Sequence, residues 1–495
     1  MENQVDWRAN AAKLNVRAKA FVNGEFVDAQ SGETFENVSP IDGRVLASVS
    51  ACGSEDVGDA VRAARAAFEK GLWSDRSPKA RKRVLIRFAE LIAEHADELA
   101  LLETLDMGKP ISDARDDLSA VIECVRWYGE AIDKLYDEIA PTPKQVLAMI
   151  TREPLGVVGA VVPWNFPLLM AAWKFAPALA AGNSVIVKPA EQSPLSVLRA
   201  AELGAEAGIP SGVFNVVPGF GETAGQALGR HMDVDAISFT GSTEVGKLFL
   251  TYSGESNMKA VSLECGGKSP IIVFAETPDL DAAARAAVSG VFYNSGQICD
   301  ATSRLLVEEK IHDALLGGVS RMAGNYVPAD PLDPSTKMGS LVDHTHMVRV
   351  LDYIAKGKSE GANLSVGGDQ VRQETGGYYV NPTIFDGVTN DMTIAREEIF
   401  GPVLAVIPFR DTEEALRIAN DSVYGLNAAL WTNDVKKAHS LAKSLRAGTV
   451  IVNSSGGGGI EVPFGGYKQS GFGRDKSLHA LEKYTQLKTT FVNLR

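Results

Sequence analysis

Hydrophobic residues recur with a helical period through most of the first 140 positions. Acidic residues follow the potential N-cap Ser54, and apolar residues then recur three or four positions apart. A serine followed by Pro78 is typical of a second helix start, and the prolines after residue 140 mark a break. This pattern predicts helices from Ser54, from Ser77 to about Met107, and over residues 113–138.

From Leu155 onward, short β-branched runs alternate with helical segments. The predicted strands cover residues 157–162, 184–187, 214–217, 236–239 and 260–263, with helices at 195–207, 223–231 and 243–252. A second series contains strands at 270–274, 305–307, 403–408 and 449–452 and a helix from Asp281. Strands that alternate with helices in this way predict an α/β fold with a parallel, doubly wound sheet.

Composition limits the classes of function. A chain of 495 residues is long enough for two to four domains, and 45% hydrophobic with 22% charged residues is ordinary globular composition. A net charge of −13 argues against nucleic acid or an anionic membrane as the main partner. The most apolar stretch, 156–170, contains two prolines and is too short to span a bilayer.

The N-terminus and the cysteines predict a cytoplasmic location. Residues 1–7 are polar and lack the basic and apolar regions of a secretory signal. The four cysteines form no C-x-x-C pair and are too few for a disulfide framework in so long a chain. We therefore expect free thiols in a reducing compartment.

Two glycine-containing turns are candidates for phosphate binding. Residues 219–225 follow a predicted strand, but the third glycine, Gly225, comes one position late for the dinucleotide motif. In residues 239–246 the small residues Thr240, Gly241 and Ser242 stand at a helix start, where backbone amides could hold a pyrophosphate. A plain αβ turn and a simply capped helix are the alternatives.

Cys299 is the candidate nucleophile, because it alone among the cysteines lies in a polar segment of small residues. Gly296 would permit close approach of a substrate, and a neighbouring helix N-terminus would favour the thiolate. A small buried side chain is the alternative. A cysteine hydrolase would need a paired histidine, and none of the seven histidines stands in an obvious partnering motif.

Glu264 is the candidate general base. It ends a predicted apolar strand just before two glycines, at the edge where open α/β sheets place their ligands. A partly apolar cleft would raise the pKa of this carboxyl into a useful range for a base. A structural salt bridge with Lys268 is the alternative.

Seven ordered motifs resemble those of the aldehyde dehydrogenase superfamily over nearly the whole chain. They lie at residues 162–167, 188–191, 239–242, 263–268, 296–299, 397–402 and 463–468. Residues 102–106 and 476–483 look most like bacterial γ-glutamyl-γ-aminobutyraldehyde and related ω-aminoaldehyde dehydrogenases. Two positions depart from the pattern: Cys265 stands where leucine is common, and the loop 456–459 lacks the acidic residues of the aminoaldehyde relatives.

The resemblance implies roles for individual residues. Cys299 would attack the aldehyde, Asn165 and the Cys299 backbone N–H would hold the oxyanion, and Glu264 would activate water. The residues implied in cofactor binding are Val162, Pro163, Trp164, Lys188, Glu191, Gly225, Thr240, Gly241, Ser242, Glu398 and Phe400. The aldehyde tunnel would be lined by Met170, Trp173 and Phe464, with Asp300 available to attract a cation. No metal is implied.

The family fold implies a Rossmann-like NAD-binding domain (1–137 and 153–263), an α/β catalytic domain (264–470), and a small β oligomerisation flap with a C-terminal tail (138–152 and 471–495). Pairing of flap strands between subunits would give a homodimer or homotetramer. NAD is expected rather than NADP, because the carboxylate of Glu191 would repel a 2′-phosphate. The alternative functions are a coenzyme-A-acylating dehydrogenase, a cysteine hydrolase and a non-enzymatic protein on a retained fold.

Overall fold

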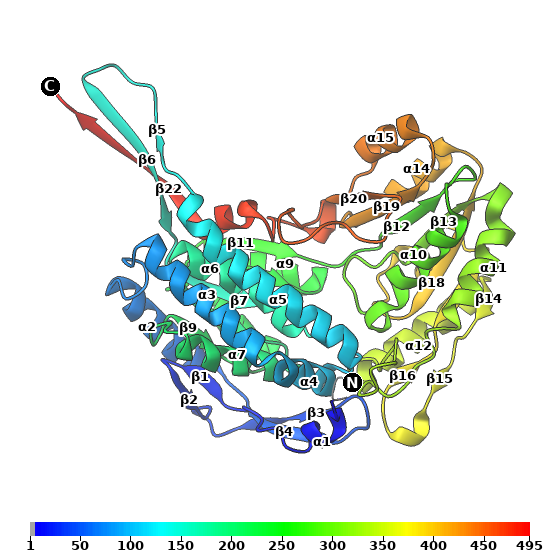
Figure 1. Cartoon of the computed structure of the whole chain (residues 1–495), viewed down its shortest axis with the longest axis horizontal. Coiled ribbons are helices and arrows are strands. Elements are labelled where there is room, and N and C mark those ends of the chain that lie inside the picture. Colours follow the sequence, from blue (N-terminus) through cyan, green and yellow to red (C-terminus); the bar gives the residue numbers. More distant parts are fainter. Residues whose placement is uncertain (1–4) are drawn as a thin grey trace.

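A computed structural model describes residues 5–495, so the first four residues of the polar N-terminal stretch lie outside it. Two bodies, each built around a sheet, make up most of the molecule, and a narrow three-stranded sheet projects from the first (Figure 1). Among the described residues no helix is long and apolar enough to cross a membrane.

The first body contains an eight-stranded sheet. Its order is β2 (Glu25–Val27), β1 (Ala20–Val22), β9 (Phe214–Val216), β8 (Ser184–Lys188), β7 (Val157–Val161), β10 (Ala236–Thr240), β11 (Ala260–Glu264) and β21 (Gly471–Phe472). The strands from β9 to β11 run parallel, and β1, β2 and β21 add antiparallel edges. Every residue of β7, β8 and β10 is buried, because helices cover both faces of the sheet.

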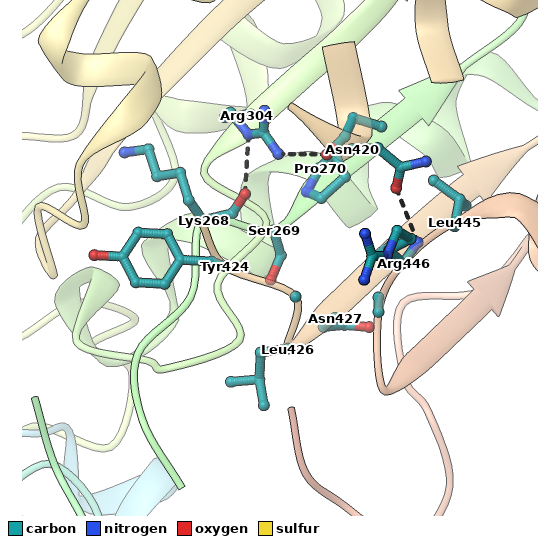
Figure 2. Close-up of a pocket in the computed structure, with 14 residues that line it drawn as sticks. Lys268, Ser269, Pro270, Arg304, Asn420, Tyr424, Leu426, Asn427, Leu445 and Arg446 are labelled. Atoms are coloured by element: carbon teal, nitrogen blue, oxygen red, sulfur yellow. Dashed lines mark hydrogen bonds between the residues drawn. The ribbon is translucent and has the colours of Figure 1, made fainter. Parts of the chain in front are cut away.

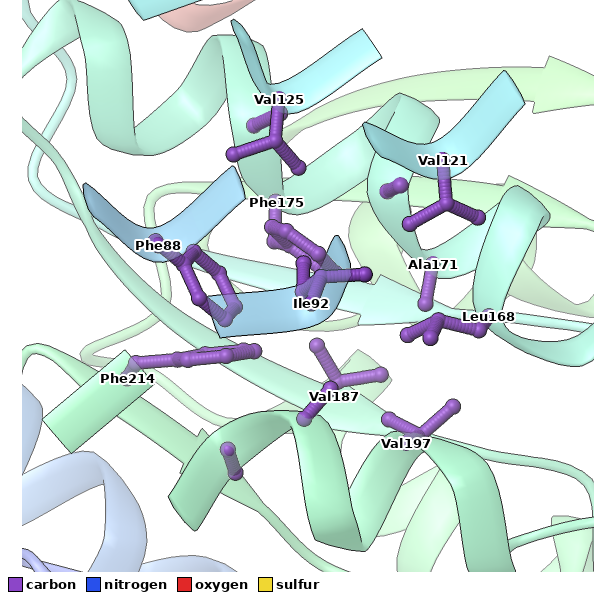
Figure 3. Close-up of a cluster of buried hydrophobic side chains, with 14 of the residues drawn as sticks. Phe88, Ile92, Val121, Val125, Leu168, Ala171, Phe175, Val187, Val197 and Phe214 are labelled. Carbon is purple, nitrogen blue, oxygen red and sulfur yellow. The ribbon is translucent and has the colours of Figure 1, made fainter. Parts of the chain in front are cut away.

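The helices of this body bury a large apolar core. They are α2 (Ser54–Glu69), α3 (Pro78–Glu94), α4 (Ala96–Met107), α5 (Ile111–Ala131), α6 (Pro167–Ala181), α7 (Leu195–Glu206), α8 (Gln226–Arg230) and α9 (Thr243–Gly254). Figure 3 shows Phe88 of α3, Val121 of α5 and Phe175 of α6 packed above Val187 and Phe214 of the sheet. This packing holds α6, which carries several site residues, in a fixed position.

The second body contains a seven-stranded sheet. Its order is β14 (Asn363–Val366), β17 (Thr383–Asp386), β18 (Val403–Phe409), β13 (Arg304–Glu308), β12 (Pro270–Val273), β19 (Asn427–Trp431) and β20 (Thr449–Val452), and only β14 is antiparallel to its neighbour. The main helices are α10 (Leu280–Phe292), α11 (His312–Ala323), α12 (His344–Ser359), α14 (Thr412–Asn420) and α15 (Val435–Ser444). Both sheets are therefore α/β units, as the alternating pattern predicted.

The projecting sheet joins β5 (Glu138–Ile139), β6 (Val146–Pro154) and β22 (Thr485–Asn493). Strands β6 and β22 pair antiparallel along their full length, from Thr485 opposite Pro154 to Asn493 opposite Val146. The C-terminus lies at the tip of this sheet, away from both bodies (Figure 1). Within the predicted tail, β21 instead pairs with β11 of the first sheet.

Several predicted elements differ from the structure. The single helix predicted to Met107 is two helices, because His95 leaves helical geometry between α3 and α4. The helix predicted over 113–138 ends at Ala131, where a 3-10 turn begins. The helix predicted from Thr223 begins with a π-helical turn, Gly221–Gly225, before α8. The strands that were not predicted include β1, β2, β3 (Thr34–Val38) and β4 (Val45–Ser50), and also β14, β17 and β19 of the second sheet.

Candidate active site

Cys299 lies in the connection between α10 and β13, where it borders two cavities. The larger, about 280 Å³, lies beside the carboxyl ends of β10 and β11, and the smaller, about 200 Å³, lies beside α6 and the loop before β21. Both cavities are lined by Cys299 and Met170. A thiol in this position can meet one ligand from each side.

The segment before Cys299 has an unusual backbone that its neighbours hold in place. Asn294, Ser295 and Gly296 all have left-handed φ angles, of 47°, 56° and 76°. A Cβ at Gly296 would overlap the carbonyl of Gly401. The glycine therefore permits close approach of the chain to itself. Gly296 lines neither cavity, and close approach of a substrate at this glycine stays a prediction.

The thiol of Cys299 is not activated by its surroundings in the protein alone. Burial raises its pKa well above the ordinary value, and three carboxylates raise it further, those of Asp300, Glu398 and Glu264. The chain after Cys299 continues into β13 and not into a helix. The expected contribution of a neighbouring helix N-terminus to the thiolate stays a prediction.

Asn165 is fixed next to the nucleophile by hydrogen bonds in both directions. The side-chain Nδ2 of Asn165 donates to the backbone carbonyl of Gln297 at 2.8 Å, and the backbone carbonyl of Asn165 accepts from Asn294 Nδ2 at 3.0 Å. Gln297 is anchored in turn by the backbone N–H of Val342, 2.9 Å from its Oε1. One N–H of the Asn165 amide remains for a ligand in the larger cavity, which this residue lines.

Glu264 ends β11 and lines the same cavity as Cys299. Both of its carboxylate oxygens are buried without a hydrogen-bond partner. Burial raises its pKa well above the ordinary value, Asp475 raises it further, and Lys174 lowers it. The direction agrees with the sequence expectation for a general base.

The alternative reading of Glu264, a salt bridge with Lys268, is wrong: no such pair occurs among the described residues, and the buried Nζ of Lys268 has no partner. Burial lowers the pKa of Lys268 to about 7. Figure 2 shows Arg304 donating to the Lys268 carbonyl beside a hollow of about 10 Å³, which is room for a single water molecule.

The larger cavity gathers most of the residues expected to bind the cofactor. Its walls include Pro163, Trp164, Thr240, Gly241, Ser242, Glu398 and Phe400. Four others lie outside its lining, namely Val162, Lys188, Glu191 and Gly225. Of these, Lys188 and Glu191 form an ion pair with each other, with Nζ 3.1 Å from Oε2.

The cavity fits a dinucleotide at its helix end. The backbone at the start of α9 faces it, and the buried Oγ1 of Thr240 has no hydrogen-bond partner there. Ser242 caps α9, because its Oγ accepts from the Val245 N–H at 3.2 Å. The capping role that the sequence left open is thus present, and the free amides and the Thr240 hydroxyl are donors suited to a phosphate.

A buried carboxylate, that of Glu398, also lines this cavity. Oε1 of Glu398 accepts from the Gly267 N–H at 2.9 Å, and burial raises the pKa of Glu398 to about 7. The ring of Trp164 meets that of Phe400 edge-on with centroids 5.2 Å apart. These groups form a polar and aromatic corner close to Cys299.

The smaller cavity holds the residues expected around the aldehyde. Met170, Trp173, Asp300 and Phe464 all line it, and the rings of Trp173 and Phe464 lie 5.3 Å apart. Gly457 and Gly458 of the glycine loop also form its wall. The nearby acidic residue Glu461 is not part of the lining, and its carboxylate accepts from the Gly459 N–H at 3.1 Å.

Known proteins identify the family. The model of the aldehyde dehydrogenase family matches residues 26–490. The chain belongs to this family. It is 53% identical over 489 residues to the NADP/NAD-dependent aldehyde dehydrogenase PuuC of Escherichia coli K12, covering 99% of this chain and 98% of that protein. The resemblance found in the sequence motifs is thereby confirmed.

Solved structures agree with this assignment. The γ-glutamyl-γ-aminobutyraldehyde dehydrogenase of Burkholderia cenocepacia J2315 is 57% identical with a TM-score of 0.97. The indole-3-acetaldehyde dehydrogenase AldA of P. syringae, in a mutant form bound to NAD+ and IAA, is 57% identical with a TM-score of 0.98. In both cases 99% of each chain is covered. The expected fold class is therefore confirmed.

The aldehyde dehydrogenase contains site residues that sequence reasoning missed. Lys174 of α6 and Asp475 form an ion pair with no exposed side-chain surface, and Lys483 also binds Asp475. This buried group supplies the charges that act on Glu264. A lysine within the otherwise apolar run 167–181 is the only sequence signal that could have shown it.

A histidine was also missed. His346, near the start of α12, lines the larger cavity and has its Nε2 2.7 Å from the carbonyl of Phe400. Its ring is therefore engaged with the backbone and not with Cys299. The thiol–histidine pair that a cysteine hydrolase needs is absent from the described residues.

Proposed function

We propose that this chain is an NAD-dependent dehydrogenase that oxidises an aldehyde to the carboxylic acid through a thioester on Cys299. The observation that carries the proposal is the position of Cys299 on the shared wall of two cavities, with Asn165 and Glu264 on the same wall of the larger one. A relative of 57% identity binds NAD+ in its solved structure, which supports NAD as the cofactor.

In the first half-reaction the Cys299 thiol loses its proton to solvent, and the sulfur adds as the thiolate to the aldehyde carbon. The oxygen becomes an oxyanion, which the free N–H of Asn165 and the backbone N–H of Cys299 stabilise. When bound, NAD supplies the acceptor for the hydride that leaves this carbon. Loss of the hydride restores the carbonyl, so that the acyl group remains on sulfur as a thioester.

In the second half-reaction water attacks the thioester and Glu264 accepts its proton. The unpartnered oxygens of Glu264 support this role, since each is available to a water molecule. The thiol leaves as the acid forms, and Cys299 is regenerated. A coenzyme-A-acylating enzyme would use an external thiol at this stage, and the buried carboxylate favours hydrolysis instead.

The cofactor contacts follow from the larger cavity. Thr240, Gly241 and Ser242 would hold the phosphates at the start of α9, and Glu398 would accept hydrogen bonds from the ribose next to the nicotinamide. Lys188 and Glu191 would bind the adenosine ribose. Pro163, Trp164 and Phe400 would pack around the cofactor, with Val162 and Gly225 nearby.

Medium-length aldehydes fit the smaller cavity best, because its walls are mostly apolar and aromatic. Relatives of this chain bear the names of a γ-glutamylamino aldehyde and an arylacetaldehyde, which supports a broad range with acylamino aldehydes included. For the assembly, we propose a homodimer or homotetramer formed through the long outer strand β22.

The deciding experiment measures NADH formation by the purified protein with aliphatic, aromatic and amino aldehydes. We expect turnover with NAD and, after rapid quenching, an acyl adduct on Cys299 by peptide mass spectrometry. Cys299→Ala should show neither. An adduct on another cysteine, or no NADH with any aldehyde, would refute the proposal.

A further inference from the structure

The smaller cavity carries one positive charge that the sequence did not suggest. Among its lining residues only Asp300, Lys476 and the thiol of Cys299 are ionisable, and the other walls are apolar, aromatic, glycine or a neutral hydroxyl. Lys476 is only 9% exposed and lines this cavity.

The turn after Asp475 fixes the position of Lys476. Its φ of 63° is left-handed, and its Nζ donates to the carbonyl of Gly458 at 3.2 Å. Nζ also lies 5.6 Å from the centroid of the Trp173 ring. These contacts hold the ammonium between the glycine loop and the aromatic wall that frames the aldehyde.

The ammonium group is incompletely satisfied. It has three N–H donors, and the Gly458 carbonyl is its one hydrogen-bond acceptor among the described residues. No carboxylate in the described part of the chain lies within ion-pair distance of it, although Asp300 and Glu461 act on it from farther away. A buried cation with free donors gains most from an anionic acceptor.

We propose that Lys476 forms a carboxylate subsite in the aldehyde cavity, so that the enzyme selects aldehydes that carry a carboxylate at the end remote from the reacting carbon. The inference rests on the proposed function, because it assigns the smaller cavity to the aldehyde. Lys476 also repels a simple ammonium group, so an ω-aminoaldehyde gains little in this cavity. Asp300, next to the nucleophile, acts in the opposite sense and limits the preference.

The test compares ω-oxocarboxylates of four to seven carbons with the n-alkanals of the same length. This series varies the distance between the carboxylate and the reacting aldehyde carbon. For each length the readout is the ratio of kcat/KM for the oxo acid to that for the alkanal. We expect Lys476→Met to lower this ratio at least tenfold at the best length, mainly through KM. Lys476→Arg should retain most of it, and Asp300→Asn should raise it.

A binding measurement separates recognition from chemistry. Glutarate should inhibit pentanal oxidation competitively in the native protein, and at least tenfold more weakly in Lys476→Met. Equal losses for oxo acids and alkanals at every length, or an unchanged ratio, would overturn the carboxylate subsite. Absence of NADH from every aldehyde would instead refute the proposed function, so the two failures are distinguishable.

Discussion

Gly266 packs so closely against Glu398 that a methyl group on Gly266 would overlap the carboxylate. The next residue, Gly267, donates its N–H to Glu398, and a Cβ at Gly267 would come 2.5 Å from the carbonyl oxygen of Cys299. Two consecutive glycines thus lie between Glu398, the proposed ribose ligand, and the nucleophile. Substitutions at these positions can displace one group without the other.

Gly266→Ala should impair cofactor binding more than stability. The overlapping atoms are at the end of a flexible side chain, so Glu398 can move away at small cost in folding free energy. We expect KM for NAD to rise about tenfold, roughly 1.4 kcal/mol of lost binding, with a thermal midpoint close to that of the native protein. Gly296→Ala is the control: its new methyl group would strike backbone at Gly401, so it should destabilise the fold.

Cys299 should react slowly with alkylating agents in the absence of ligands. Its pKa is raised by burial and nearby carboxylates, so the thiolate fraction at neutral pH is small. We expect the rate at which iodoacetamide labels Cys299 to rise about tenfold for each pH unit between 7 and 9. Peptide mass spectrometry at successive times measures this rate. A rate independent of pH over this range would show a thiolate already formed.

Cys52, Cys124 and Cys265 should each tolerate alanine with substantial activity left.

Glu264→Gln should separate the two half-reactions. The amide cannot accept a proton from water, while hydride transfer to NAD depends on Cys299 and Asn165 and not on the base. We expect a pre-steady-state burst of NADH close to one per site, then turnover slowed about a hundredfold, within the range for loss of a general base. Equal loss of burst and turnover would mean that Glu264 activates Cys299 or only supports the structure.

The same residue predicts a pH dependence. A base acts in its deprotonated form, and burial raises the pKa of Glu264 above the ordinary range. Steady-state hydrolysis in the native protein should therefore fall as pH drops through this raised pKa, while the burst amplitude persists. Stopped-flow measurements between pH 5 and 9 would show this fall in hydrolysis. If the pH–rate profile of Glu264→Gln fell in the same way at low pH, the titration would belong to another group.

Glu191 should favour NAD over NADP. Its side chain is 33% exposed and pairs with Lys188, so it stands ready to meet a ribose hydroxyl and to repel a 2′-phosphate. Glu191→Gln should raise the NADP-to-NAD ratio of kcat/KM about tenfold. A native protein that already prefers NADP would contradict this assignment.

The edge strand β22 should govern assembly. Its exposed side chains include Leu487 and Phe491, which are 63% and 66% exposed. A long edge strand with such residues favours pairing with another copy. We expect Leu487→Asp with Phe491→Asp to shift the protein toward monomer in light scattering coupled to size exclusion, whereas Thr489→Ser should leave the native mass. An unchanged mass in the double variant would place the interface elsewhere.

The sequence predicted the central strands best. Strands β7, β8, β10 and β11 lie within about one residue of their predicted bounds, because continuous β-branched runs between helices leave few alternatives. Strands β1 to β4 were missed, since they are short and partly exposed and resemble loop sequence. The break at His95 was missed because apolar periodicity continues on both sides of it.

The site was predicted where chemistry is local and missed where it depends on distant segments. Cys299, Glu264 and Asn165 stand in short distinctive motifs, and the structure places all three around one cavity. Lys174 and Asp475, which form an ion pair, are 301 positions apart in the sequence. The burial of Lys476 depends on Trp173 and the glycine loop. The tight contact of Gly296 with Gly401 could not be predicted, because it exists only in three dimensions.

The two cavities that share Cys299 and Met170 also determine how inhibitors should behave. A compound shaped for the smaller cavity would compete with the aldehyde and leave NAD binding unaffected, while an adenosine analogue would do the reverse. Both cavities of one protein molecule can then be occupied at the same time, so two weak inhibitors of different chemistry can bind together. A single compound joining both would have to pass beside the sulfur, where an electrophile placed in the linker would be held against the thiol.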